Sequence, residues 1–235
     1  MKTKSLPSVL LATALAGSIF SQSVKITPKT TTYRRPKAED RYKRTFTIVY
    51  PRVTSLSASL NKRIENTVSY EKILDLDLKE ELDGRWLEKA SYEVNYNKRG
   101  ILVITLTMEG SGAYPSCASK TVVVDMKAGN RLMAADLFSN LPGLAAICKR
   151  FQKAEVKRAL ADRKKGLDAS FFQETDFKVE NLDEFSVGDR GVTFIYDYGF
   201  PHVALALQPD GRYFFTWRQL RPYIKTGGLL HQFVR

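Results

Sequence analysis

Four side chains in one short segment have the types and spacing best suited to chemistry. They alternate along a strand-like run and its bend at Gly199 and Pro201, and they are Tyr196, Tyr198, Phe200 and His202. Aromatic rings with a polar tip suit the recognition of sugars or proteins, and Tyr114, in the loop Gly110–Pro115, is expected to face them. Alternating aromatic residues also form walls of protein cores. The sequence therefore leaves two interpretations of this segment, a ligand-binding surface and a core wall.

The sequence offers no complete catalytic set. His202 and His231 are the only histidines, no Gly-x-Ser-x-Gly motif is present, and the histidines are too few and too far from the cysteines for a zinc site. Glycoside hydrolysis needs two carboxyl groups at a fixed separation, for which Asp183 with Glu184, or Asp197, are the candidates. We expect no catalytic residues, no metal and no cofactor, with a hydrolase of envelope glycans as a remote alternative.

The first 23 residues have the composition of a secretory signal peptide. Lys2 and Lys4 precede an apolar run of 12 residues, Val9–Phe20, and small serines follow. This run is shorter than the roughly 20 residues that a membrane-spanning helix needs. We therefore predict a cleaved signal over residues 1–23, no transmembrane anchor, and a protein that is periplasmic or secreted.

The predicted mature chain is strongly basic. The net charge of +12 falls to +10 when residues 1–23, which carry two lysines and no acids, are removed. An exported protein does not meet nucleic acid, so we expect anionic envelope polymers or lipid headgroups as partners. The alternative is that the excess lysines only keep the surface soluble.

Cys117 and Cys148 are the two cysteines. In an oxidising compartment a pair favours one disulfide, which would close a loop of about 30 residues and contribute roughly 3 kcal/mol. However, Cys148 lies four residues after Leu144 and three before Phe151, on the apolar face of a predicted helix, where a free thiol is also common. Both alternatives stay open.

Residues 24–41 are predicted to form a basic, flexible linker. The segment is rich in threonine and contains Pro28, Pro36 and six lysines or arginines, which leaves little to bury. We treat residues 42–235 as a single domain, in which residues 42–139 and 140–235 could form two lobes.

Hydrophobic periodicity predicts the elements of this domain. A period of two predicts strands within Tyr42–Val53, Tyr92–Tyr96, Ile101–Thr107, Lys120–Met126, Phe185–Val187, Gly191–Tyr198 and Val203–Leu207. The loop Gly110–Pro115 is expected to be a shaped crossing between strands and not a tight turn. A helical period predicts helices after Thr54, within Tyr70–Leu87, over Asn140–Gly166, and near Phe171 and Leu220. Together they predict an α+β fold in which an antiparallel sheet packs with a few helices as a two-layer sandwich.

The predicted helix over Asn140–Gly166 has a strongly basic face. Its outward positions carry Lys149, Arg150, Lys153, Lys157 and Arg158. Because such faces are usually solvated, we expect plain surface here and not a binding site.

Several short motifs occur in an order that resembles a known extracytoplasmic domain. They are Tyr50-Pro51 before a helix with Asn61 and Ile64, a hairpin, a Gly-Ala-aromatic-Pro loop, a Val-Val-Asp strand, Gly129, Asp136-Leu137-Phe138, and Val192-Thr193-Phe194 with Tyr196. Over roughly residues 45–225 the chain resembles the domain of unknown function in the lysozyme-sensing anti-sigma factor RsiV, which also lies beside the catalytic domain of the peptidoglycan deacetylase PdaC.

This resemblance implies an α+β sandwich and a role in binding, in one case of lysozyme. The chain departs from the family in two ways. It shows no sigma-binding segment and no membrane span, so an anti-sigma role is not expected. Tyr114 stands where the family often has histidine, so no role of that histidine is transferred.

The residues thus predict an exported, non-enzymatic binding domain for cell-envelope material such as peptidoglycan or an anionic polymer. A protein ligand such as lysozyme is the alternative. Lysozyme is itself basic, so a local acidic patch would be needed to attract it. The candidates for such a patch are Asp75, Asp77, Glu80 and Glu81.

Overall fold

The computed structural model describes residues 23–37, 42–54, 56–84, 86–111, 115–162, 166–173 and 175–234. It contains a five-stranded sheet in the order β1-β2-β3-β4-β5 and a three-stranded sheet in the order β6-β7-β8. The strands are β1 (Ile26–Arg34), β2 (Thr45–Val53), β3 (Leu87–Lys98), β4 (Ile101–Ser111), β5 (Pro115–Asp125), β6 (Phe185–Gly188), β7 (Gly191–Ile195) and β8 (Arg212–Thr216). The predicted signal peptide lies, except for Ser23, outside the described residues.

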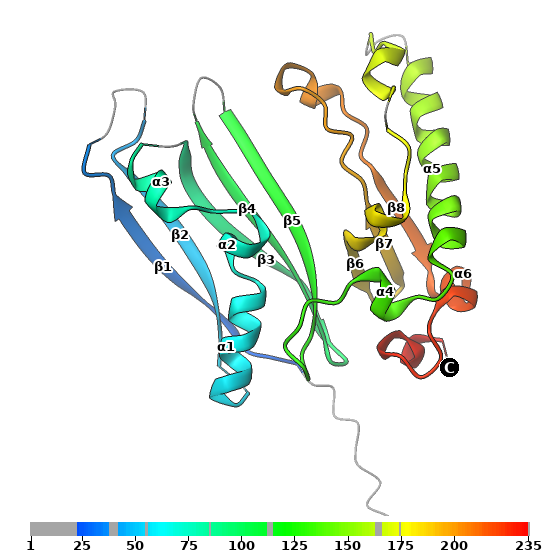
Figure 1. Ribbon diagram of the computed structural model, residues 1–235, viewed down its shortest axis with the longest axis horizontal. Coiled ribbons are helices and arrows are strands. Elements are labelled where there is room, and N and C mark those ends of the chain that lie inside the picture. Colours follow the sequence, from blue (N-terminus) through cyan, green and yellow to red (C-terminus); the bar gives the residue numbers. More distant parts are fainter. Residues whose placement is uncertain are drawn as a thin grey trace, which may run out of the picture.

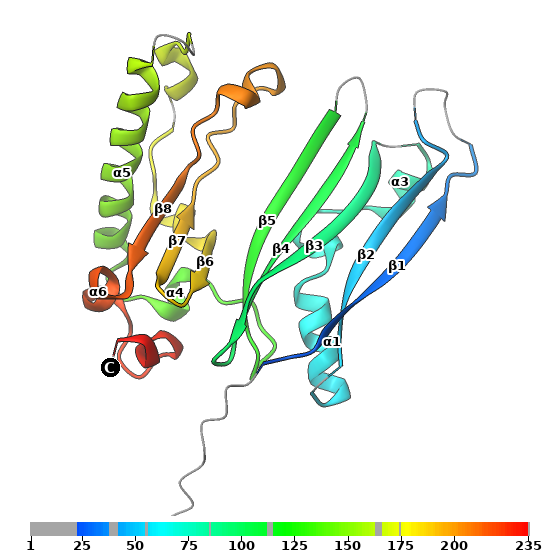
Figure 2. The same ribbon diagram turned by 180° about the vertical axis from the view of Figure 1, so that it is seen from behind.

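Helices cover one face of each sheet, as the two opposite views show (Figures 1 and 2). They are α1 (Ala58–Thr67), α2 (Tyr70–Ile73), α3 (Leu78–Leu82), α4 (Ala134–Leu137), α5 (Leu141–Ala161) and α6 (Trp217–Leu220). The short 3-10 helices are η1 (Ala169–Phe172), η2 (Val179–Asp183), η3 (His202–Leu207), η4 (Arg221–Tyr223) and η5 (Leu229–Phe233). The predicted α+β class, with helices packed on a mostly antiparallel sheet, is confirmed.

The large sheet contains one parallel pair, β2 with β3, beside three antiparallel pairs. A parallel pair needs a crossover connection, and the segment between the two strands supplies it with α1, α2 and α3. The Ser57 side chain accepts a hydrogen bond from Leu60 N and so begins α1. The crossover buries Ile64, Val68 and Tyr70 against the large sheet, in a core cluster that we call the first core cluster.

The predicted linker over residues 24–41 is wrong for most of its length. Residues 26–34 form β1, which pairs with β2 at nine successive positions. Val24 is buried, and both its N–H and its carbonyl bond to the side chain of Asn97. Threonine favours strands, and an edge strand tolerates Pro28 and leaves many residues exposed. A polar edge strand therefore has the composition of a linker.

The second half of the chain forms its core between α5 and the small sheet. Inward residues of the three strands, such as Phe185, Phe194 and Phe215, pack against α5 residues including Leu144. Four residues of the large sheet, Tyr96, Ile101, Val103 and Val123, belong to this second cluster, whereas the first cluster lies on the helix-covered face. The large sheet therefore contributes side chains to both cores.

Two predicted connections differ from the structure. Residues 202–207 form the 3-10 helix η3 and not a strand, because Gly199 adopts a positive φ of 65° and Pro201 cannot donate to a ladder. Strands β4 and β5 are paired up to Ser111 and Pro115, so the predicted crossing is a hairpin connection. Residues 112–114 of that connection lie outside the described residues.

Candidate functional site: a groove beside helix α5

The predicted aromatic site forms part of the core. Tyr196, Tyr198 and Phe200 are 9%, 5% and 6% exposed, and all belong to the second core cluster. The Phe172 ring lies 5.6 Å from that of Tyr198 and 5.3 Å from that of Phe200. The structure therefore supports the interpretation of this segment as a core wall. The alternative prediction, a ligand-binding surface on these three rings, is wrong.

His202 and Tyr114, the other predicted site residues, are not part of this cluster. His202 is exposed at the start of η3, where its Nε2 contacts the carbonyl oxygen of Pro115. Tyr114 lies outside the described residues. The structure thus does not bring the five predicted residues together.

A buried hydrogen-bond network fixes the aromatic segment to α5. Glu155 Oε2 accepts from the hydroxyls of Tyr198, at 2.8 Å, and Tyr213, at 3.0 Å, while its Oε1 accepts from Gly211 N at 3.2 Å. Burial is the main cause that raises the pKa of both phenols above the ordinary value. These tyrosines are therefore neutral hydrogen-bond donors that position the segment after β7.

The other predicted candidates have structural partners. Asp183 Oδ1 accepts from Ala134 N, and Glu184 forms an ion pair with Lys120 at 2.7 Å. Asp197 accepts from Gly199 N within a turn. In the predicted acidic patch, Glu81 is buried beside Arg35 and is not available at the surface.

Cys117 and Cys148 are both free thiols, so the disulfide alternative is wrong for this structure. Cys117 is exposed on β5, whereas Cys148 is fully buried on the inner face of α5. Cys148 thus occupies the core position that its helical spacing indicated. Burial raises the pKa of the Cys148 thiol to about 12.

Helix α5 builds the most distinctive pocket of the described chain. The helix begins at the cap Asn140, whose Oδ1 accepts from Gly143 N, and Pro142 stands in its first turn. Its fully buried residues include Leu144, Cys148 and Gln152, four residues apart, on the face turned to the small sheet. After Gln152 the helix has no fully buried residue, and a groove opens there against Phe172, Thr175 and Asp176.

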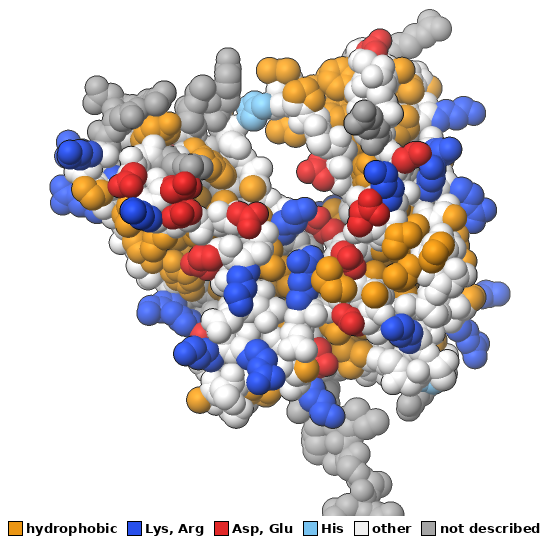
Figure 3. Space-filling model, in the orientation of Figure 1, with side chains coloured by type: hydrophobic (Ala, Val, Ile, Leu, Met, Phe, Trp, Pro, Cys, Tyr) orange, Lys and Arg blue, Asp and Glu red, His pale blue; other side chains and the backbone are white. Residues whose placement is uncertain are grey.

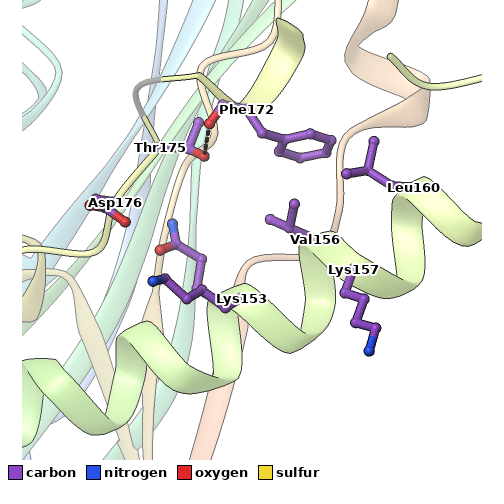
Figure 4. A pocket seen from close by; sticks show the side chains of 8 residues that line it. Lys153, Val156, Lys157, Leu160, Phe172, Thr175 and Asp176 are labelled. Carbon is purple, nitrogen blue, oxygen red and sulfur yellow. Dashed lines mark hydrogen bonds between the residues drawn. The ribbon is translucent and has the colours of Figure 1, made fainter. Parts of the chain in front are cut away.

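The groove has a volume of about 380 Å³, within the range of ligand sites. Its walls come from α5 and from the end of η1, and the lining residues are Gln152, Lys153, Val156, Lys157, Leu160, Phe172, Thr175 and Asp176. Figure 4 shows that Val156, Leu160 and Phe172 gather at one end, and that Lys153, Thr175 and Asp176 lie at the other. The groove therefore has an apolar end and a polar end.

Gln152 contributes a buried donor to the groove. The residue is 2% exposed, and its Oε1 accepts from Phe177 N at 2.7 Å, which fixes the orientation of the amide. Its Nε2 has no hydrogen-bond partner. Burial raises the pKa of Tyr196, and the interaction of its phenol with the Gln152 side chain partly offsets that rise. A buried, unpartnered N–H group is costly to the protein, and a ligand acceptor would satisfy it.

The electrostatics of the polar end are positive. Asp176 forms an ion pair with Lys149 at 2.7 Å. Hydrogen bonding to Lys149, together with the charges of Lys149, Lys153 and Lys178, lowers the pKa of Asp176. Three lysines thus surround one carboxylate, and Figure 3 shows lysine and arginine side chains along the margin that α5 occupies. This end suits an anion.

The groove lining includes no cysteine, serine or histidine. Among the described residues, no cluster of three or more histidine, cysteine or carboxylate side chains could hold a metal ion. Within the same ranges, no helix is both long and apolar enough to span a bilayer.

The groove lysines belong to the basic face that the sequence predicts to be plain surface, and no role was predicted for Gln152. A signal was present, because Gln152 continues the spacing of Leu144 and Cys148 and so occupies a core position. A glutamine in a buried stripe needs partners for both ends of its amide. The position of Phe172, Thr175 and Asp176 beside the helix, by contrast, had no signal in the sequence.

No protein-family model matches the chain, and no curated protein matches it either. Two crystal structures of DUF3298 family proteins share its fold. The protein from Bacteroides fragilis is 12% identical with a TM-score of 0.58, and the match covers 89% of this chain and 97% of that one. The protein from Pseudomonas aeruginosa is 16% identical with a TM-score of 0.59, and the match covers 87% and 95%.

These neighbours define the fold class and nothing further. The chain has the fold of DUF3298, a family defined as a domain of unknown function, which agrees with the unassigned domain expected from the sequence motifs. The link to the anti-sigma factor and to the deacetylase stays a prediction. The function must therefore be argued from the groove.

Proposed function

We propose that this protein is an exported, non-catalytic binding domain that recognises an anionic component of the cell envelope through the groove beside α5. The observation that carries the proposal is the unpartnered Gln152 Nε2, held in a groove that Lys153 and Lys157 also line. A buried donor and the Lys153 cation at the same end of a cavity favour an acidic group.

The charge of the whole chain supports the same class of partner. The net charge is +12 for the full chain, and the N-terminal residues have the pattern of a secretory signal. An anionic surface attracts each nearby lysine by about 1 kcal/mol. Removal of two groove lysines should therefore weaken binding by roughly thirtyfold, since each 1.4 kcal/mol is tenfold.

Co-sedimentation with purified cell-wall sacculi, with and without their anionic polymers, tests the proposal across a salt series. We expect retention that weakens with salt and with the double variant Lys153→Gln/Lys157→Gln. The matched control is Arg150→Gln/Arg158→Gln, which removes two charges from the same helix outside the groove lining. Equal loss in both doubles would assign binding to bulk charge, and no retention at low salt would overturn the proposed function.

A protein partner is the second candidate, and one surface feature favours it. Val203 is 87% exposed and Leu205 is 44% exposed on η3, at the tip of the second half of the molecule. Exposed apolar side chains at a tip are typical of protein contacts. Capture of lysozyme that is abolished by Val203→Ser, with sacculus binding unchanged, would support this candidate, and no capture at low salt would reject lysozyme.

A further inference from the structure

The distribution of polar and apolar groups along the groove limits what can occupy it. Lys153 and Asp176 lie at one end, and the side chains of Val156, Leu160 and Phe172 line the other (Figure 4). A uniformly polar ligand would leave the apolar end in contact with sugar hydroxyls or water. An apolar ligand would leave the Gln152 donor unsatisfied. Only a ligand with one acidic end and one apolar end matches both.

The polar end favours an anion over a neutral or cationic group. Gln152 offers an N–H donor that has no partner, and Lys153 offers a charged donor beside it. The one carboxylate of the lining, Asp176, already pairs with Lys149. An acidic headgroup would thus receive two donors and meet a carboxylate that is already neutralised.

The apolar end of the groove has hydrophobic side chains that are partly exposed. Leu160 is 38% exposed although it lies one turn beyond Val156 on the same face of α5. The Phe172 ring, which lines this end, packs against the rings of Tyr198 and Phe200. A hydrocarbon chain laid between these residues would remove apolar surface from water on both sides.

We propose that the groove binds a single-chain amphipathic anion, for which an alkyl phosphate is the probe, with the acidic headgroup at Gln152 and Lys153 and the first part of its acyl or alkyl chain between Leu160 and Phe172. The inference rests on the proposed function and deepens it, because it names the class of anionic envelope component. The aromatic cluster then acts as a support for the groove wall.

Isothermal titration of the purified protein with three probes tests the ligand class. The probes are dodecyl phosphate below its micelle concentration, ethyl phosphate, and dodecyltrimethylammonium. We expect dodecyl phosphate to bind at least tenfold more tightly than ethyl phosphate, and the cationic probe to bind at least tenfold more weakly than dodecyl phosphate.

Single substitutions then locate the site. Gln152→Glu keeps an oxygen for Phe177 N but replaces the free donor with a carboxylate, and should weaken dodecyl phosphate at least tenfold. Lys153→Gln, at an exposed position, should weaken both phosphates and guards against misfolding of the buried variant. Leu160→Ser should weaken dodecyl phosphate severalfold and leave ethyl phosphate unchanged. Arg158→Gln is the control and should change neither.

Three outcomes overturn the inference. Equal affinity for ethyl and dodecyl phosphate would show that the groove does not bind the hydrocarbon chain. Salt-dependent sacculus retention through Lys153 and Lys157 would still leave the proposed function standing. Tight dodecyl phosphate binding that survives both Lys153→Gln and Leu160→Ser would place the ligand elsewhere. Absence of binding to either phosphate together with absence of sacculus retention would overturn both proposals.

Discussion

Replacement of Arg35 by alanine should destabilise the protein strongly, although the sequence placed this residue in a linker. The side chain of Arg35 is almost fully buried beside Glu81. Its guanidinium donates to three carbonyl oxygens, those of Glu81 at 2.8 Å, Lys43 at 2.6 Å and Leu87 at 2.8 Å. It also lies 4.7 Å from the centre of the Phe46 ring. One side chain thus joins the end of β1 to the start of β2, α3 and β3.

The magnitude follows from what the substitution leaves behind. Removing one partner of a buried ion pair costs roughly 3–5 kcal/mol, and the substitution also takes the donor away from three carbonyl oxygens. Glu81 Oε2 retains the bond from Leu87 N, which offsets a part of this loss. We therefore expect a loss of about 3 kcal/mol in the free energy of unfolding and a fall in Tm on the order of 10 °C.

Urea denaturation followed by circular dichroism is the assay, with Arg34→Ala as the matched control. Arg34 is the exposed neighbour on the same strand, so its substitution should change stability by less than about 0.5 kcal/mol. Equal and small effects of the two substitutions would refute the reasoning, because they would mean that residues 24–37 are a linker after all.

Three further predictions test other parts of the structure. Glu155→Ala should lower the free energy of unfolding by roughly 1–3 kcal/mol in urea denaturation, because the hydroxyls of Tyr198 and Tyr213 lose their charged acceptor and only one of them can donate to the other; a change below about 0.5 kcal/mol would contradict the network. A thiol-reactive chromophore should label Cys117 alone in the native protein and Cys148 only after unfolding, since the latter is buried with a raised pKa; no labelled thiol, even after unfolding, would contradict the free-thiol assignment, and two labelled native thiols would contradict the burial of Cys148. Asp176→Asn should tighten dodecyl phosphate binding about twofold to fivefold at pH 7, consistent with the small energies of exposed ion pairs, and the difference should vanish below the lowered pKa of Asp176, where the wild-type carboxyl is also neutral; weaker binding by the variant would contradict a positive polar end.

Local patterns were sufficient where packing and periodicity agree. The alternation in Tyr92–Tyr96 and Ile101–Thr107 predicted the hairpin of β3 and β4, and the helical period over Asn140–Gly166 predicted α5, which ends five residues earlier at Ala161. Buried hydrophobic residues recur at the period of the element in both cases, so the sequence records the structure directly.

The sequence failed where composition hides the structural role. The segment 24–41 is polar because β1 is an edge strand, and Arg35 is buried only because three distant backbone carbonyls receive it. No local pattern encodes such contacts. The strand predicted at Val203–Leu207 failed because Gly199 and Pro201 redirect the chain, an effect that outweighs the β propensity of Val203 and Leu205.

The candidate site was predictable only in part. The sequence placed Tyr196, Tyr198 and Phe200 on one segment, but their exposure decides between core and site, and exposure is a tertiary property. Gln152 could have been found from its place in the buried stripe of α5. The groove itself depends on where Phe172, Thr175 and Asp176 lie beside the helix, and tertiary contacts such as the bond from Phe177 N to Gln152 fix that position.

The most direct test of the central claim is the side-chain amide signal of Gln152 in a ¹⁵N-correlated NMR spectrum, followed during titration with dodecyl phosphate below its micelle concentration. The unpartnered Nε2 should acquire an acceptor, so this signal should shift saturably, with the same midpoint as the calorimetric titration. A Gln152 signal that stays in place while other resonances shift and saturate would show that the phosphate binds elsewhere and would contradict the assignment of the groove.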